Sequence, residues 1–129
     1  MSTLAEIVKP SFITVAPEDT LGEVAERMTT QNVGAVVVKD HGRLIGILTE
    51  RDMLRAMAAR VHTSDARVRQ WMTADPICAP GDMALDEAAK VMLDNGFRHL
   101  PVLAGQSVLG VVSLRRVLGG RRQPAPEAA

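Results

Sequence analysis

Residues 44–52 read LIGILTERD, and the same pattern returns at residues 108–116 as VLGVVSLRR. In both stretches an apolar run interrupted by one glycine is followed by a hydroxyl residue and then by charged residues. The match extends outward, because residues 13–54 align with residues 77–118 without a gap at an offset of 64, and nine of the 42 pairs are identical. An internal repeat of this kind predicts a two-fold object in which each copy buries its apolar face against the other, with two similar clefts at the seam.

The composition allows one hydrophobic core of ordinary size. The chain has 129 residues, of which 47% are hydrophobic, and single domains commonly span about 100–150 residues. Fifteen basic and fifteen acidic side chains cancel, so no overall field draws the protein to nucleic acid or to an anionic membrane. An aromatic content of 2% also disfavours the stacking surfaces of single-strand nucleic-acid binders. We therefore expect neither a nucleic-acid partner nor a membrane partner.

The sequence contains little that indicates catalysis or metal binding. Cys78 is the single cysteine, which excludes an intramolecular disulfide and a multi-cysteine zinc site, and we interpret it as a small hydrophobic residue rather than a nucleophile. No Ser-His-Asp, paired-carboxylate or metal-ligand spacing stands out, so we predict neither a catalytic residue nor a metal. No N-terminal stretch resembles a signal peptide or a membrane span, and the expected location is the cytoplasm.

Each copy has the same order of predicted elements, β-α-β-β-α, which indicates an α/β (α+β) fold. A short apolar segment precedes a helix whose apolar residues recur at spacings of three and four. Two β-branched strands joined by a glycine turn follow, and a last helix ends the copy. The expected N-caps of the first helix in each copy are Asp19 or Thr20, and Asp82. The predicted ranges are 12–15, 21–28, 35–38, 44–48 and 50–59 in the first copy, and 77–79, 85–93, 100–103, 108–112 and 114–118 in the second.

The repeat also sets the expected domain organisation. Residues 5–62 are predicted to form repeat 1, residues 63–67 a connector and residues 68–120 repeat 2, with Trp71 packed under the second repeat. Because the connector is short, the two repeats are expected to pack side by side into one compact module. Residues 121–129 are rich in proline and charge and are predicted to form a flexible tail.

These features together resemble the tandem CBS domain pair, also called a Bateman module, over about residues 5–120. In this family the two repeats pack through their sheets about a pseudo-two-fold axis, and the two clefts between them bind adenine nucleotides. The resemblance therefore implies a ligand sensor rather than an enzyme. It rests on the element order and on local motifs, which are NVGA at 32–35, LIGILT at 44–49, TERD at 49–52, WMT at 71–73 and FRHLPV at 97–102.

The TERD segment marks the first candidate site. It lies where a strand enters a helix, and the unpaired N–H groups and positive end of a helix attract phosphate. The resemblance implies that the hydroxyl of Thr49 helps to hold a phosphate and that Asp52 accepts hydrogen bonds from both ribose hydroxyls. Thr-x-x-Asp before a helix is also nearly a capping box, in which both side chains satisfy backbone donors. Both roles stay open at this point, and they can coexist.

The second copy departs from that pattern. It reads SLRR at 113–116, so Ser113 keeps the hydroxyl and Arg116 replaces the carboxylate. Such a site cannot hold a ribose diol in the family's way, although a guanidinium suits phosphate oxygens. A solvated position near the chain end is an equal alternative for Arg116. We therefore expect unequal sites, with one nucleoside site at Asp52 and a second site that is empty, weak or used by the far phosphate of a longer ligand.

The residues at the start of the first buried strand also differ in charge between the two copies. The resemblance implies that Arg98 and His99 reach toward phosphates, whereas a solvated strand end is the alternative. At the matching positions Gly34 and Ala35 are small and leave room for an adenine ring against the sheet. This asymmetry favours one nucleoside-binding half and one basic half.

Five more residues complete the predicted nucleotide-binding set. The base edge is expected near the backbone of Thr14 and Val15, and Val36 would line the ring unless it belongs to the ordinary core. The set also contains Arg51 and Pro101.

The expected function is that of a regulatory module for energy sensing, which binds an adenine nucleotide and acts through a change in conformation or assembly. AMP is the first ligand expected, followed by ADP, ATP and NAD(H), because all of them contain adenosine. The resemblance also implies a homodimer, and the target protein is unknown. The alternative is a ligand-independent module that dimerises or docks onto another protein, and the loss of the second carboxylate favours it.

Overall fold

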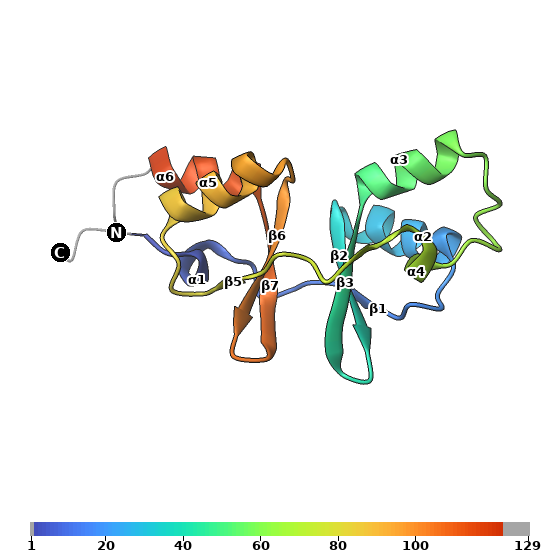
Figure 1. Ribbon diagram of the computed structural model, residues 1–129, viewed down its shortest axis with the longest axis horizontal. Coiled ribbons are helices and arrows are strands. Elements are labelled where there is room, and N and C mark those ends of the chain that lie inside the picture. The colour runs from blue at the N-terminus through green and yellow to red at the C-terminus, as the bar shows by residue number, and fades with distance from the viewer. Residues whose placement is uncertain (1, 123–129) are drawn as a thin grey trace. The chain divides into compact units, whose positions relative to one another are not determined.

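The computed structural model describes residues 2–122, which divide into two compact units. Residues 12–76 form what we call the central unit. Residues 2–11 and 77–122 form the terminal unit, which contains both ends of the described chain. In each unit a small β-sheet carries its helices on one side (Figure 1).

The central unit has a four-stranded sheet in the order β1-β2-β3-β4. Strand β1 runs parallel to β2, and the other neighbouring pairs are antiparallel. Helices α2, α3 and α4 lie on one side of this sheet (Figure 1). The elements are β1 (Thr14–Val15), α2 (Leu21–Gln31), β2 (Ala35–Asp40), β3 (Arg43–Thr49), α3 (Glu50–Ala58), α4 (Val68–Trp71) and β4 (Thr73–Ala74).

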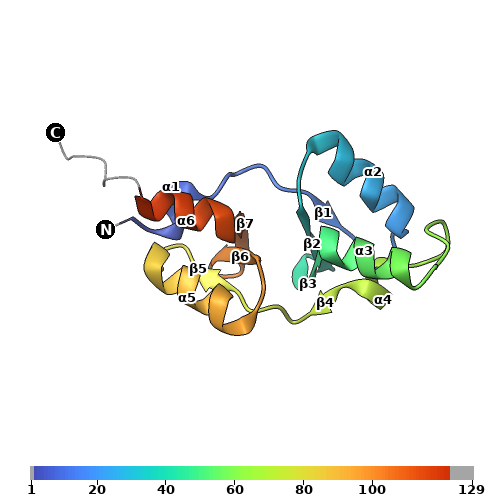
Figure 2. The same ribbon diagram turned by 90° about the horizontal axis from the view of Figure 1, so that it is seen from above.

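The terminal unit has a three-stranded sheet in the order β5-β6-β7, again with one parallel and one antiparallel pair. The short helix α1 lies beside α6, and α5 packs along α6 (Figure 2). The elements are α1 (Leu4–Ile7), β5 (Ala79–Pro80), α5 (Leu85–Asn95), β6 (His99–Ala104), β7 (Ser107–Ser113) and α6 (Leu114–Arg122).

The predicted order β-α-β-β-α is confirmed in both units. In each unit one face of the sheet carries apolar residues that pack into a core. Val36, Val38 and Leu48 are fully buried in the core of the central unit, together with apolar residues of its helices. Leu100, Val102 and Val112 have the same role in the terminal unit. The two units are thus built from the same local pattern.

Some boundaries differ from those predicted. Thr20 is the N-cap of α2 and accepts a hydrogen bond from the backbone of Glu23, as expected. The expectation for Asp82 is wrong, because α5 begins after Ala84, which has no side-chain cap. Strand β4 is absent from the predicted ranges, since two residues carry no periodic signal.

The short helices α1 and α4 are related by the same offset of 64 as the rest of the repeat. Helix α4 packs within the central unit, onto the elements that precede it in the chain. Val68 is fully buried there, and Trp71 lies against the core. The expected packing of Trp71 with the second repeat is therefore wrong. Helix α1 instead packs onto the terminal unit, and its Leu4 is fully buried there.

Matching backbone hydrogen bonds hold both short helices. The N–H of Val68 donates to the carbonyl of Asp19 over 2.9 Å, and that of Leu4 donates to Met83 over 3.0 Å. Both donor positions and both acceptor positions differ by 64 residues. Each short helix is thus attached to the segment that precedes α2 or α5.

The predicted repeats and the compact units divide the chain by different criteria. The ranges 5–62 and 68–120 follow the internal repeat, whereas the units follow contact and place residues 2–11 with the later half of the chain. Helix α6 extends to Arg122, so the predicted tail begins within it. Residues 123–129 of that tail lie outside the described residues.

Gly110 shows why the repeat keeps a glycine in its last strand. Its φ of +155° is unusual for other residues, and a β-carbon there would lie 2.6 Å from the carbonyl oxygen of Lys9. At the matching position, a β-carbon on Gly46 would lie 3.0 Å from the carbonyl oxygen of Thr73. In each unit the segment that follows a short helix passes close to this glycine.

We expect Gly110→Ala to lower the free energy of unfolding by at least about 1 kcal/mol, because the β-carbon meets backbone that cannot move aside cheaply. Chemical denaturation would measure the change. Gly119→Ala is the matched control, since Gly119 lies in α6 and a β-carbon added there would have no neighbouring atom within 4 Å, and alanine favours helix by about 1 kcal/mol. Equal stability of the two variants would contradict the close approach.

Candidate nucleotide-binding site

The structure gathers predicted site residues into one group in each unit. In the central unit, Ala35 at the start of β2 pairs with Thr49 at the end of β3. The N–H of Glu50, the first residue of α3, donates to the carbonyl of Gly34 over 3.0 Å. Gly34, Ala35, Thr49 and the first turn of α3 are therefore neighbours. We call these residues, with Arg51 and Asp52, the central group.

Asp52 is the buried charged residue of the central group and is 5% exposed. Its Oδ2 accepts hydrogen bonds from the backbone N–H of Thr49 over 2.9 Å and from the Thr49 hydroxyl over 3.2 Å. The N–H of Asp52 in turn donates to the Thr49 hydroxyl oxygen over 3.4 Å. The structure therefore contains the capping box that the sequence left open as one of two roles.

The other carboxylate oxygen of Asp52 has a partner that was not predicted from the sequence. Nη1 of Arg55 lies 3.0 Å from Oδ1, and the arginine side chain is 60% exposed whereas that of Asp52 is 7% exposed. The signal for this pair is the spacing of three on a helix, at which an acid and a base are neighbours. Both oxygens of Asp52 thus have donors before any ligand is considered.

The start of α3 has fewer available N–H groups than the sequence suggested. Glu50 donates to Gly34, and Asp52 donates to Thr49. Two of the first three N–H groups of α3 therefore have partners within the central unit, and the Arg51 side chain is exposed.

Strand β1 is placed two residues further along β2 than the central group. Thr14 pairs with Val37, and the Thr14 carbonyl accepts a hydrogen bond from Arg27 over 3.1 Å. The side chains of Val15 and Val36 are buried in the core under the helices. For Val36 the ordinary core role therefore holds, and what Val15 can offer a ligand is its backbone.

The terminal unit repeats this arrangement with different chemistry. His99 pairs with Ser113, and the N–H of Leu114 donates to the carbonyl of Arg98 over 2.7 Å. The hydroxyl of Ser113 accepts from the N–H of Arg116 over 3.1 Å. We call Arg98, His99, Ser113 and Arg116 the terminal group. It keeps the helix cap of the central group but replaces the carboxylate with exposed guanidinium groups.

Arg116 is tied to the N-terminal segment. Its Nε donates to the carbonyl of Ile7, the last residue of α1. The residue is nevertheless exposed. Pro101 lies two residues further along β6, opposite Val111, and is buried. In the terminal group Arg98 and Arg116 are thus both exposed cations next to the start of α6, and Arg116 is the one bonded to the N-terminal segment.

Three further properties of the described residues concern the cysteine thiol, metal binding and membrane-spanning helices. Burial raises the pKa of the Cys78 thiol, which keeps it protonated and poorly nucleophilic at neutral pH. Within residues 2–122, no three side chains of the His, Cys, Asp and Glu kind come together as a metal site would require. In the same range no helix has the length and apolar character needed to cross a membrane.

Comparison with known families agrees with this geometry. The family model described as the CBS domain matches residues 4–59 and again residues 68–121. The chain therefore belongs to the CBS domain family and carries two CBS domains in tandem. This confirms the resemblance seen in the sequence.

Relatives differ in how much more they contain. An uncharacterized 17.7 kDa protein of Acidianus ambivalens is 37% identical over 114 residues, which are 87% of this chain and 68% of that protein. The CBS domain-containing protein YhcV of Bacillus subtilis is 30% identical over 88% of this chain and 81% of its own length. In contrast, the chain spans 23% of an inosine-5'-monophosphate dehydrogenase of Methanocaldococcus jannaschii, with 33% identity.

Solved structures share the fold over almost the whole chain. A CBS-domain-containing protein from Agrobacterium tumefaciens is 28% identical, covers 93% of this chain and 99% of its own, and has a TM-score of 0.86. The CBS domain pair of protein MJ0100 is 25% identical, covers 95% and 99%, and has a TM-score of 0.83. That protein was solved in complex with 5'-methylthioadenosine and S-adenosyl-L-methionine.

Proposed function

We propose that this CBS domain pair is a regulatory module that binds an adenine nucleotide. The observation that carries the proposal is the Asp52 carboxylate, a charged group that is buried at the point where β3 enters α3. An ionised carboxylate with a second lone pair on Oδ1 can accept a hydrogen bond from a ribose hydroxyl, and burial strengthens such a bond. Asp52 then both caps α3 and binds the ribose hydroxyls.

The ligand is proposed to be AMP, with ADP, ATP and NAD(H) as further candidates. All of them contain the adenosine that Asp52 and the small residues Gly34 and Ala35 would accept. The complex of protein MJ0100 with two adenosyl compounds supports an adenosine ligand in general. The exposed guanidinium group of Arg51, at the start of α3, favours a ligand that carries phosphate.

Binding is proposed to act through conformation or assembly rather than through catalysis. Relatives such as YhcV consist largely of the part that matches this chain. A change in the shape of the module can therefore itself be the signal. We further propose that the protein is a cytoplasmic homodimer that reports the energy state to a target protein. A ligand shifts such an equilibrium by no more than its difference in affinity for the two states.

Titration calorimetry and thermal denaturation with AMP, ATP, NAD and S-adenosylmethionine test the proposal. A ligand that binds the folded state must raise the melting temperature, and calorimetry gives the number of sites. We expect AMP to bind at one strong site per chain, because the terminal group lacks the carboxylate. Two equal AMP sites per chain would contradict the asymmetry, and no binding of any of these compounds would contradict the function.

A prediction concerns the charge at the start of α3. We expect Arg51→Ala to weaken AMP binding roughly two- to fivefold, the scale of an exposed ion pair, and to leave adenosine binding unchanged. Calorimetry with both ligands measures the difference. Arg43→Ala, which removes another exposed charge of the same unit from the β2–β3 hairpin, should affect neither ligand. Equal losses for AMP and adenosine in Arg51→Ala would show that Arg51 contacts no phosphate.

The alternative is a module that docks or dimerises without a ligand. Two observations favour it, since the capping box and Arg55 already occupy the Asp52 carboxylate, and Arg116 is bound to Ile7. Apolar side chains remain exposed, with Leu54 at 65% and Met57 at 72% on α3. Sedimentation that detects the same dimer with and without every nucleotide, combined with no calorimetric signal, would establish this alternative.

A further inference from the structure

The central unit contains a chain of contacts that leads away from Asp52. Arg55 donates to Oδ1 of Asp52 over 3.0 Å, and its guanidinium carbon lies 5.7 Å from the centre of the Trp71 ring. One guanidinium group therefore contacts a buried carboxylate and an aromatic face at once. Trp71 is the single tryptophan of the protein.

We infer that Arg55 is a positioning residue that holds the Asp52 carboxylate while the site is empty and transmits the arrival of a ligand to Trp71. The inference rests on the proposed nucleotide binding at Asp52. It adds a residue that the binding motif does not contain, and it assigns a signal to the geometry around that residue.

Competition for the carboxylate provides the first step. Oδ2 already accepts two hydrogen bonds from Thr49, one of them from the backbone. A ribose diol that binds Asp52 through both hydroxyls therefore needs Oδ1, where Arg55 is the donor. The arginine side chain is 60% exposed, so it can move into water at little cost, whereas the cap is part of the helix start. Arg55 is then the partner that gives way.

The position of Trp71 provides the second step. Trp71 ends α4, and the next strand, Thr73–Ala74, pairs with β3. Beside the indole lies an open hollow of about 420 Å³, lined by Val61, His62, Asp65, Ala66, Gln70 and Trp71. The indole thus has a cation on one side and space next to it. A change in Arg55 can shift Trp71 and with it the segment that joins α4 to the edge of the sheet.

The test uses the fluorescence of Trp71 in the whole protein without ligand. We expect Arg55→Ala to raise the quenching of Trp71 by acrylamide, because the indole loses its cover. Asp52→Asn should raise it in the same direction, because an exposed cation–π contact by itself favours the stacked arrangement only about two- to fivefold. Arg55→Lys should restore part of the protection, since an ammonium can pair with Asp52 but lacks the planar group that stacks.

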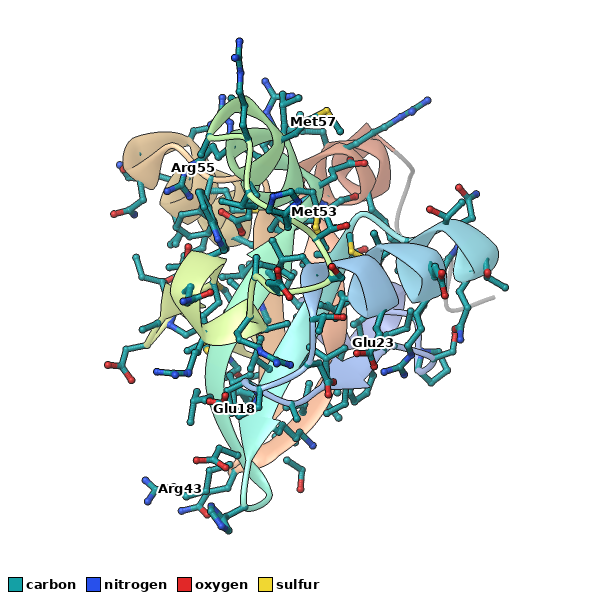
Figure 3. All side chains as sticks on the ribbon, turned by 90° about the vertical axis from the view of Figure 1, so that its right-hand side faces the viewer. Glu18, Glu23, Arg43, Met53, Arg55 and Met57 are labelled. Atoms are coloured by element: carbon teal, nitrogen blue, oxygen red, sulfur yellow. The ribbon has the colours of Figure 1, made fainter. Side chains whose placement is uncertain are left out.

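Arg43→Ala is the matched control, because Arg43 lies at the hairpin end of the same unit, far from Arg55 (Figure 3). Circular dichroism checks that each variant is folded. If Asp52→Asn leaves quenching at the wild-type value, Arg55 covers Trp71 without the carboxylate and the inference is overturned. Unchanged quenching in Arg55→Ala overturns it as well.

Adding AMP separates this inference from the proposed function. In the wild type we expect AMP to increase the quenching of Trp71, and in Arg55→Ala to bind by calorimetry without changing it further. Binding to the wild type that leaves Trp71 unaffected overturns the inference and leaves the function intact. If AMP binds neither protein, the proposed function and the ligand-dependent step both fail, while the ligand-free measurements still decide whether Arg55 connects Asp52 with Trp71.

Discussion

Leu4→Ala is expected to lower the free energy of unfolding by about 2–5 kcal/mol, the cost of removing a buried leucine from a packed core. Leu4 is 0% exposed and lies in the core of the terminal unit with Leu85, Leu100 and Val117. Its core neighbours are more than seventy residues away in the chain. Because a small protein has a total stability of about 5–15 kcal/mol, this change removes a large fraction of it. Urea denaturation followed by circular dichroism measures the loss.

Leu93→Ala provides the matched control for this prediction. Leu93 lies on α5 of the same unit but is 62% exposed, so its truncation should change stability by less than about 0.5 kcal/mol. A Leu4→Ala variant as stable as Leu93→Ala would mean that the N-terminal helix is not attached to the terminal core. Such a result would also remove the support that Ile7 gives to Arg116.

Asp52→Ala is expected to have two effects that can be measured separately. Loss of the capping box should cost about 0.5–2 kcal/mol of stability. Loss of a charge-assisted hydrogen bond to ribose should weaken AMP binding by about 1–3 kcal/mol, or roughly five- to 150-fold. Thermal denaturation without ligand measures the first effect, and calorimetry with AMP measures the second.

Two further variants separate the cap from the binding role. Thr20→Ala removes the N-cap of α2 in the same unit and should lower stability in the same way without affecting AMP. Asp52→Asn retains an oxygen that can accept from the backbone of Thr49, so it should preserve most of the stability and still weaken AMP binding. If Asp52→Ala loses stability but binds AMP as tightly as Thr20→Ala does, Asp52 is a cap only and the proposed site is wrong.

Much of the candidate site follows from short-range pattern. Ala35 and Thr49 are brought together by a hairpin whose strands are visible as apolar runs, and the same holds for His99 and Ser113. The offset of 64 then transfers each position of one group to the other. The partner of Asp52 required the structure, because a spacing of three permits an ion pair without deciding which rotamer Arg55 adopts. The stacking on Trp71 was less predictable still, since it joins α3 to a helix that begins thirteen residues after Arg55.

The repeated order of helices and strands, the apolar face of each sheet and the start of each last helix all follow from the amino-acid pattern. These properties depend on periodicity and on capping residues within a few positions of one another. The positions of the short helices, in contrast, depend on packing between segments that are distant in the chain. Helix α4 stays with the strands that precede it, whereas α1 packs with strands at the other end of the chain. The four residues of α1 do not by themselves indicate which strands they pack against. The burial of Leu4 depends on a surface formed by residues much later in the chain.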